Sequence, residues 1–296
     1  MMKKKTAGKT VHAGSGLQPA NGFLLCGLGW LTMVIGLFAA TWIGHLAERA
    51  GSPSALADVL RGIVVTSIVA PIAFRLRGRF PIPLCLLPLS KTGIANLLGG
   101  AGLPILLAGC GFGLAVQLGW IDILEWHGSF SLAAAVLGNA LVAFLYEALP
   151  EELTLRGLVY SGLRTKLPAF AAYVGQIALF VCVPVAVNGL QRLSGMAPGV
   201  EIHADYVVLL LAFGTVLQLL RGCTGALWAS VGFHLAFLEI SRFVVTQNEV
   251  RLFTYAERVE GTGPFFILFA MVILGGILVA GAVRLWQMAR LKKAKP

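Results

Sequence analysis

The stretch FSLAAAVLGNALVAFLYEALPEELTLR, residues 130–156, decides the fold of this protein. Residues 130–146 contain no charged side chain, and a helix of about 20 apolar residues is long enough to cross a membrane. The stretch nevertheless ends in three carboxylates, Glu147, Glu151 and Glu152. An ionisable side chain inside a membrane span is energetically unfavourable and by default indicates a functional site.

The composition of the whole chain indicates the same membrane setting. The 296 residues are 57% hydrophobic and 12% charged, whereas a soluble domain is about 25% charged. The sequence predicts an all-α polytopic membrane protein: a basic disordered leader over 1–21, a single transmembrane helical bundle over 22–288 and a basic cytosolic tail over 289–296. Eight apolar segments are long enough to span the bilayer: 22–45, 55–74, 93–119, 130–156, 168–190, 205–221, 225–245 and 264–287.

The positions of the basic residues predict the orientation. The formal net charge is +10, but the lysines cluster at the two ends of the chain and most arginines lie in short gaps between apolar segments. This pattern suits lipid headgroups rather than a nucleic acid, which we exclude as a partner. Lys and Arg collect in cytoplasmic loops, so both termini are expected in the cytosol. The proline-rich basic stretch 75–91 is expected to be an interfacial loop.

The carboxylates at the end of 130–156 are expected to fall on two helix faces. Glu147 and Glu151 are four residues apart and share one face, and Glu152 shares another with Arg156, so we expect a Glu152–Arg156 ion pair. Pro150 removes a helix hydrogen bond and is expected to kink the span. The alternative is a plain helix end that emerges into the headgroups. Apolar residues continue beyond the carboxylates, which argues against that alternative.

A histidine on another span lies at a similar depth. His234 is nine residues inside the segment 225–245, which corresponds to about 13 Å along a helix. A lone buried histidine is more often structural than catalytic. A histidine level with two carboxylates can instead divide acid and base roles with them, because low dielectric and neighbouring charge separate their protonation equilibria.

Two motifs resemble those of a known family. PEELTLRGLVYSGL (150–163) resembles the EExxxR motif of the CPBP family, the CAAX-protease and bacteriocin-processing (Abi) proteins, and LRGCTGALWASVGFHLAF (220–237) resembles its last motif region. The resemblance covers about 147–240. It implies an intramembrane endopeptidase, in a bacterial plasma membrane with its site facing the cytosol. Its substrate would be a membrane-associated peptide or protein, prenylated or bacteriocin-like.

The resemblance also implies roles for individual residues. Glu151 and Glu152 would activate water, Arg156 would fix the glutamate geometry, and His234 would support the oxyanion or the water. Glu147 is a further supporting candidate. A divalent metal such as zinc would have Glu151, Glu152 and His234 as its ligands. Catalytic zinc usually has three protein ligands, so this set has no ligand to spare and only one histidine. The need for a metal and the oligomeric state both stay open.

The chain departs from the family pattern at two positions. The middle motif, FxxxH, matches Phe180 but has Pro184 in place of the histidine, and the last motif has Leu238 where the family has Asn or Asp. Asn188 is the first candidate to stand in, and Gln176 and His203 are the others, although an amide does not titrate and His203 is expected in an external loop. Two functions are therefore compatible with the resemblance: an active protease, or a catalytically degenerate relative that acts as a membrane binding or immunity protein. A small proton-coupled transporter is a third, although the chain has no internal repeat.

Overall fold

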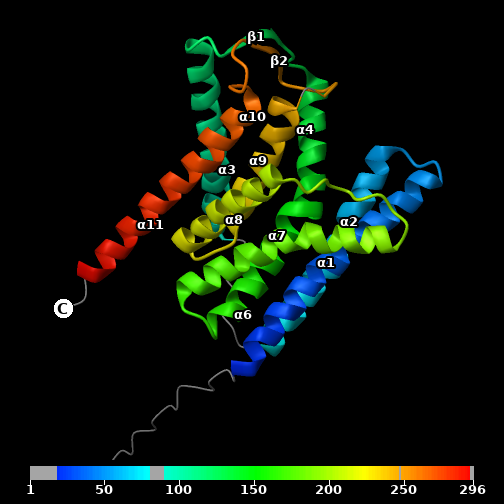
Figure 1. The fold of residues 1–296 in the computed structure, drawn as a ribbon, viewed down its shortest axis with the longest axis vertical. Helices are drawn as coiled ribbons and strands as arrows, with labels where there is room; N and C mark the ends of the chain where they lie inside the picture. Colours follow the sequence, from blue (N-terminus) through cyan, green and yellow to red (C-terminus); the bar gives the residue numbers. More distant parts are fainter. Residues whose placement is uncertain (1–18, 81–89, 247, 294–296) are drawn as a thin grey trace, which may run out of the picture.

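A computed structural model describes residues 19–80, 90–246 and 248–293 (Figure 1). Its first three helices are α1 (Pro19–Arg49), α2 (Ser54–Arg79) and α3 (Lys91–Gln117). The fourth span is one continuous run of α4 (Phe130–Ala143), η1 (Phe144–Ala148), α5 (Leu149–Glu151), η2 (Glu152–Val159) and α6 (Tyr160–Arg164), in which η marks a π-helical segment. The remaining helices are α7 (Ala169–Leu193), α8 (Ala204–Thr224), α9 (Trp228–Ile240), η3 (Ser241–Val245), α10 (Pro264–Ile267), η4 (Leu268–Leu274) and α11 (Gly275–Lys293).

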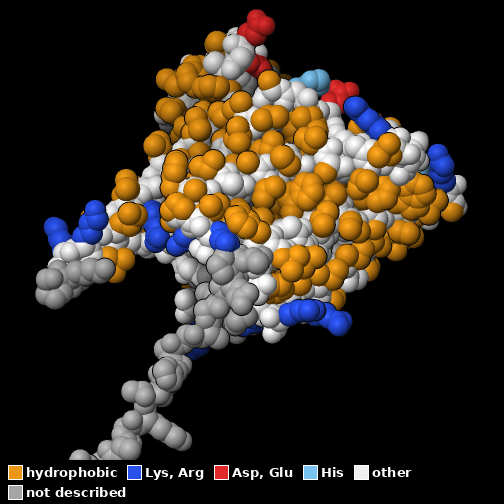
Figure 2. Space-filling view, turned by 60° about the horizontal axis from the view of Figure 1, so that its bottom comes forward, with side chains coloured by type: hydrophobic (Ala, Val, Ile, Leu, Met, Phe, Trp, Pro, Cys, Tyr) orange, Lys and Arg blue, Asp and Glu red, His pale blue; other side chains and the backbone are white. Residues whose placement is uncertain are grey.

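Eight of the described helices are long and apolar enough to cross a membrane. The predicted fold class, an all-α polytopic membrane protein, is therefore confirmed. Hydrophobic side chains cover most of the face shown in Figure 2, and charged side chains lie around its edge, as expected of a surface that contacts lipid. The orientation of the bundle in the membrane stays a prediction. The spans are Asn21–Arg49, Ser54–Arg79, Lys91–Gln117, Phe130–Arg164, Ala169–Leu193, Ala204–Thr224, Trp228–Val245 and Pro264–Lys293.

Three local features differ from the sequence-based expectation. The fourth span continues past residue 156 to Arg164, because the residues after the carboxylates are buried rather than solvated. Residues 75–79 form the last turns of α2 instead of a loop; residues 81–89 of the expected loop and 1–18 of the expected leader lie outside the described part of the chain. The segments between spans also contain two short strands, β1 (Ile121–Trp126) and β2 (Phe253–Glu257), which pair antiparallel.

The fourth span is not broken at Pro150. The proline lies in α5, between the π-helical segments η1 and η2. A π-helical turn closes its hydrogen bonds one residue further along the chain than an α-helical turn, and such turns are frequent at functional sites. The lost proline hydrogen bond is thus absorbed within a continuous helix.

Two glycines allow α3 and α9 to pack at very short range. A Cβ atom added at Gly232 would lie 2.1 Å from the carbonyl oxygen of Leu97, and one added at Gly100 would lie 2.1 Å from the carbonyl oxygen of Ala229. Small residues permit this kind of backbone approach between membrane helices. Because α9 carries His234, this close packing of α3 and α9 also fixes the position of that histidine.

We expect Gly232→Ala to lower the thermal stability of the protein markedly. The new methyl group would force α3 and α9 apart, and overpacking of this kind destabilises by about 1–3 kcal/mol or more. Gly99→Ala is the matched control, because a Cβ atom at Gly99 meets nothing within 4 Å and alanine is the better helix former. Thermal unfolding in detergent checks the prediction. An unchanged melting temperature for Gly232→Ala would contradict the close approach.

Candidate active site

Glu152, Arg156 and His234 meet in the core of the bundle. The Oε1 atom of Glu152 lies 3.2 Å from Nη1 of Arg156 and 3.4 Å from Nδ1 of His234. The Glu152 and Arg156 side chains are 0% exposed and that of His234 is 3% exposed. Glu152 and Arg156 are one turn apart on η2, whereas His234 comes from α9. The expected Glu152–Arg156 ion pair is therefore present, and the same carboxylate also contacts the imidazole.

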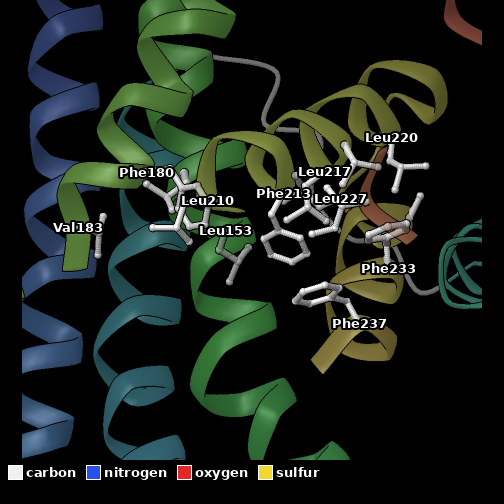
Figure 3. Packing of buried hydrophobic residues seen from close by; sticks show 14 of the residues in the cluster. Leu153, Phe180, Val183, Leu210, Phe213, Leu217, Leu220, Leu227, Phe233 and Phe237 are labelled. Atoms are coloured by element: carbon white, nitrogen blue, oxygen red, sulfur yellow. The ribbon is translucent and has the colours of Figure 1, made fainter. Parts of the chain in front are cut away.

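Aromatic rings surround these charged groups. The guanidinium carbon of Arg156 lies 4.5 Å from the ring centre of Phe180. The ring of His234 packs edge-on against Phe213, with centroids 4.9 Å apart, and Phe213 in turn packs on Phe237. Figure 3 shows the rings of Phe213 and Phe237 together, with Phe180 beside Leu210. These contacts restrict His234 to one orientation and exclude bulk water from its Phe213 side.

A cavity of about 460 Å³ lies beside this cluster. Glu147, Glu151 and His234 all line it, so the two glutamates share a face as their spacing predicts. Glu152 and Arg156 lie outside the lining and behind His234. The structure thus separates the two adjacent glutamates: Glu151 faces the cavity, and Glu152 is buried against a cation. Most of the other lining residues are apolar.

A second polar network, which the sequence analysis missed, borders the same cavity. Arg242, from η3, donates to Glu147 and forms an ion pair with it. It also donates to the side-chain oxygen of Asn139, which donates in turn to Glu239. Arg242 follows His234 by two helical turns and lies outside both family motifs. In the sequence, the feature that could have indicated its role is a charged residue within an apolar span.

The two departures from the family pattern both face the cavity. Pro184 and Leu238 line it, so apolar groups occupy the positions where the family has a histidine and an amide or acid. Asn188 also lines the cavity, but its Nδ2 atom donates to the carbonyl oxygen of Val200 at 2.6 Å. Its amide nitrogen thereby ties the loop between α7 and α8 to α7. Gln176 is fully buried on α7 and does not line the cavity.

The donor set does not fit a metal site. Within residues 19–80, 90–246 and 248–293, no three His, Cys, Asp or Glu side chains form a group that could hold a metal ion. A catalytic zinc ion usually has three protein ligands. One oxygen of Glu152 is also already engaged by both Arg156 and His234. Glu152 and His234 thus form a contacting acid–base pair, and Glu151 lies beside His234 in the cavity wall.

Comparison with known proteins identifies the part of the chain that carries these residues. Residues 133–237 match the family described as type II CAAX prenyl endopeptidase Rce1-like. No curated protein and no solved structure gave a significant match. The matched segment contains Glu151, Glu152, Arg156 and His234, and it ends just before Leu238. This match confirms, for residues 133–237, the resemblance stated from the two motifs.

Proposed function

We propose that this protein is an intramembrane endopeptidase in which Glu151 activates the attacking water. The observation that carries the proposal is that Glu151 and His234 line one cavity while Glu152 contacts His234 from behind. A carboxylate and an imidazole at one site can take base and acid roles when their environments differ. Here one glutamate faces the cavity and the other is held by a buried cation.

The proposed chemistry divides the roles among four side chains. Glu151 accepts the proton of a water molecule that attacks the scissile carbonyl carbon, and His234 donates a hydrogen bond to the oxygen on which negative charge develops. Glu152 holds the imidazole through Nδ1, so that the other ring nitrogen is directed away from Glu152. Arg156 compensates the buried charge of Glu152. The proton that Glu151 accepted from water is then transferred to the leaving amine, which completes the hydrolysis.

The cavity suggests the substrate class. Its wall is largely apolar and includes Leu210, Phe213 and Phe237, which suits an extended apolar peptide segment rather than a charged one. The lining includes residues of five spans, so the substrate segment would have to enter within the membrane region. We therefore propose a membrane-associated peptide or protein as substrate. A bacterial plasma membrane and a cytosol-facing site stay part of this proposal.

A second function is favoured by Pro184 and Leu238. Both line the cavity, where the family has polar residues, and proline can neither donate a backbone hydrogen bond nor titrate. A chain that kept the fold and the Glu152–Arg156 pair could bind a membrane peptide without cleaving it. This alternative is a membrane binding or immunity protein.

Reporter cleavage by four versions of the protein separates the two functions. We would test wild type, Glu151→Ala/Glu152→Ala, His234→Ala and Pro184→His in proteoliposomes, with prenylated and unprenylated membrane-anchored peptides. The protease proposal expects wild type to cleave, the double glutamate variant to be inactive and His234→Ala to be strongly impaired. Cleavage by Pro184→His alone would instead show that the scaffold is competent and the native chain is not, in favour of the binding protein.

A further inference from the structure

The guanidinium group of Arg156 has unused hydrogen-bond donors in the core. Its side chain is 0% exposed, and its closest charged partner is Oε1 of Glu152 at 3.2 Å. None of its three nitrogens makes a well-aligned hydrogen bond within the described part of the chain. An arginine presents five N–H donors, and buried polar groups are nearly always hydrogen-bonded. Arg156 therefore requires a partner in addition to Glu152.

Gln176 has buried polar atoms that could pair with these donors. Its side chain is completely buried on α7, and neither Oε1 nor Nε2 has a hydrogen-bond partner among the residues that the structure describes. Leaving such an amide unpaired destabilises a protein by about 1–3 kcal/mol. Its carbonyl oxygen is a neutral acceptor, which is the group that a guanidinium already paired with one carboxylate can still use.

The two side chains lie on facing surfaces of neighbouring helices. Gln176 and Phe180 are four residues apart on α7 and share one face. Phe180 is the ring over which the Arg156 guanidinium lies, at 4.5 Å. The segment η2, which carries Arg156, packs against α7. The α7 surface that meets Arg156 is therefore the surface on which Gln176 lies.

We propose that Gln176 is a positioning residue for the candidate active site. Its Oε1 atom accepts a hydrogen bond from one ordered water that Arg156 also donates to, and so holds the guanidinium against Glu152. Glu152 in turn holds His234 through Nδ1. The catalytic consequence rests on the proposed protease function, whereas the Gln176–Arg156 contact does not.

Kinetics test the catalytic consequence. We expect Gln176→Leu to lower kcat about 10- to 100-fold, as loss of a supporting hydrogen bond does around other sites, and to leave KM unchanged because Gln176 does not line the cavity. Thermal stability should fall, because leucine removes the acceptor and leaves buried donors of Arg156 unpaired. Gln176→Asn keeps the amide, leaves room for a water and should recover much of kcat.

The matched control is Gln218→Leu. Gln218 is 3% exposed, also has an unpaired Oε1, and lies on α8, which packs against α7, α9 and α11. It should keep wild-type kcat. A wild-type kcat for Gln176→Leu would overturn the proposal. A loss of kcat that Gln176→Asn does not recover would also overturn it.

A thermal double-mutant cycle tests the contact without any cleavage assay. Arg156→Leu and Gln176→Leu would be unfolded singly and together in detergent, with Arg156→Lys replacing Arg156→Leu if that variant does not fold. Side chains in contact give non-additive effects, so the fall in melting temperature caused by the Arg156 variant should change when Gln176→Leu is added. Additive shifts would overturn the contact. Coupling in a protein that cleaves no reporter would refute the proposed function and leave the Gln176–Arg156 contact standing.

Discussion

Replacement of Glu151 by glutamine is expected to lower kcat for reporter cleavage by a factor on the order of 10²–10⁴, the range associated with loss of a general base. Glu151 is the carboxylate that faces the cavity together with His234. Among the described residues it has no ion-pair partner, whereas Glu147 pairs with Arg242 and Glu152 pairs with Arg156. Glutamine keeps the size of the side chain but cannot accept the proton of water.

Comparison with the other two glutamates makes this prediction specific. Glu147→Gln also changes a carboxylate in the cavity wall. Because that carboxylate is neutralised by Arg242, its replacement should lower kcat much less than Glu151→Gln does. Glu152→Gln should lower both kcat and the melting temperature, because it leaves the Arg156 charge buried without a counter-charge. Glu151→Gln should unfold like wild type. Equal cleavage by Glu151→Gln and wild type would refute the role assigned to Glu151.

The fold was largely predictable because the membrane restricts the alternatives. A span must bond its own backbone, so long apolar segments indicate helices almost independently of tertiary context. The strands β1 and β2 were not predictable in this way, since paired residues such as Trp126 and Phe253 are far apart in the sequence. The extension of the fourth span to Arg164 depends on burial by other helices, which the local sequence does not reveal.

The candidate site was predictable in composition but not in detail. Helix spacing predicted the Glu152–Arg156 pair, and equal depth brought His234 into consideration. Spacing alone does not tell which of the two helix faces borders the cavity, because that depends on how α7, α8 and α9 pack around the fourth span. Asn188 was ranked as a stand-in from its position one turn after Pro184; its hydrogen bond to Val200 depends on the path of a distant loop.

Arg156→Met is expected to reduce the free energy of unfolding by about 3–5 kcal/mol, the range found when one partner of a buried ion pair is removed. Arg156 is 0% exposed and so is the carboxylate that it faces. Methionine has a comparable length and fills the site beside Phe180, so a cavity is not the main effect. The dominant effect is that Glu152 keeps a buried charge with only His234 as a partner.

Unfolding of two further variants separates this charge effect from a packing effect. Glu152→Gln/Arg156→Met removes both charges, and exchange of a buried pair for uncharged groups is often nearly neutral, so the double variant should recover much of the lost stability. Arg61→Met is the comparison at a partly exposed site: it removes the ion pairs with Glu48 and Asp58, in which the arginine side chain is 20% exposed. It should reduce the free energy of unfolding less than Arg156→Met does, because exposed pairs contribute about 0–1 kcal/mol. If the double variant were no more stable than Arg156→Met, packing around Phe180 rather than the uncompensated Glu152 charge would be the cause, and the positioning role of the Glu152–Arg156 pair would have to be abandoned.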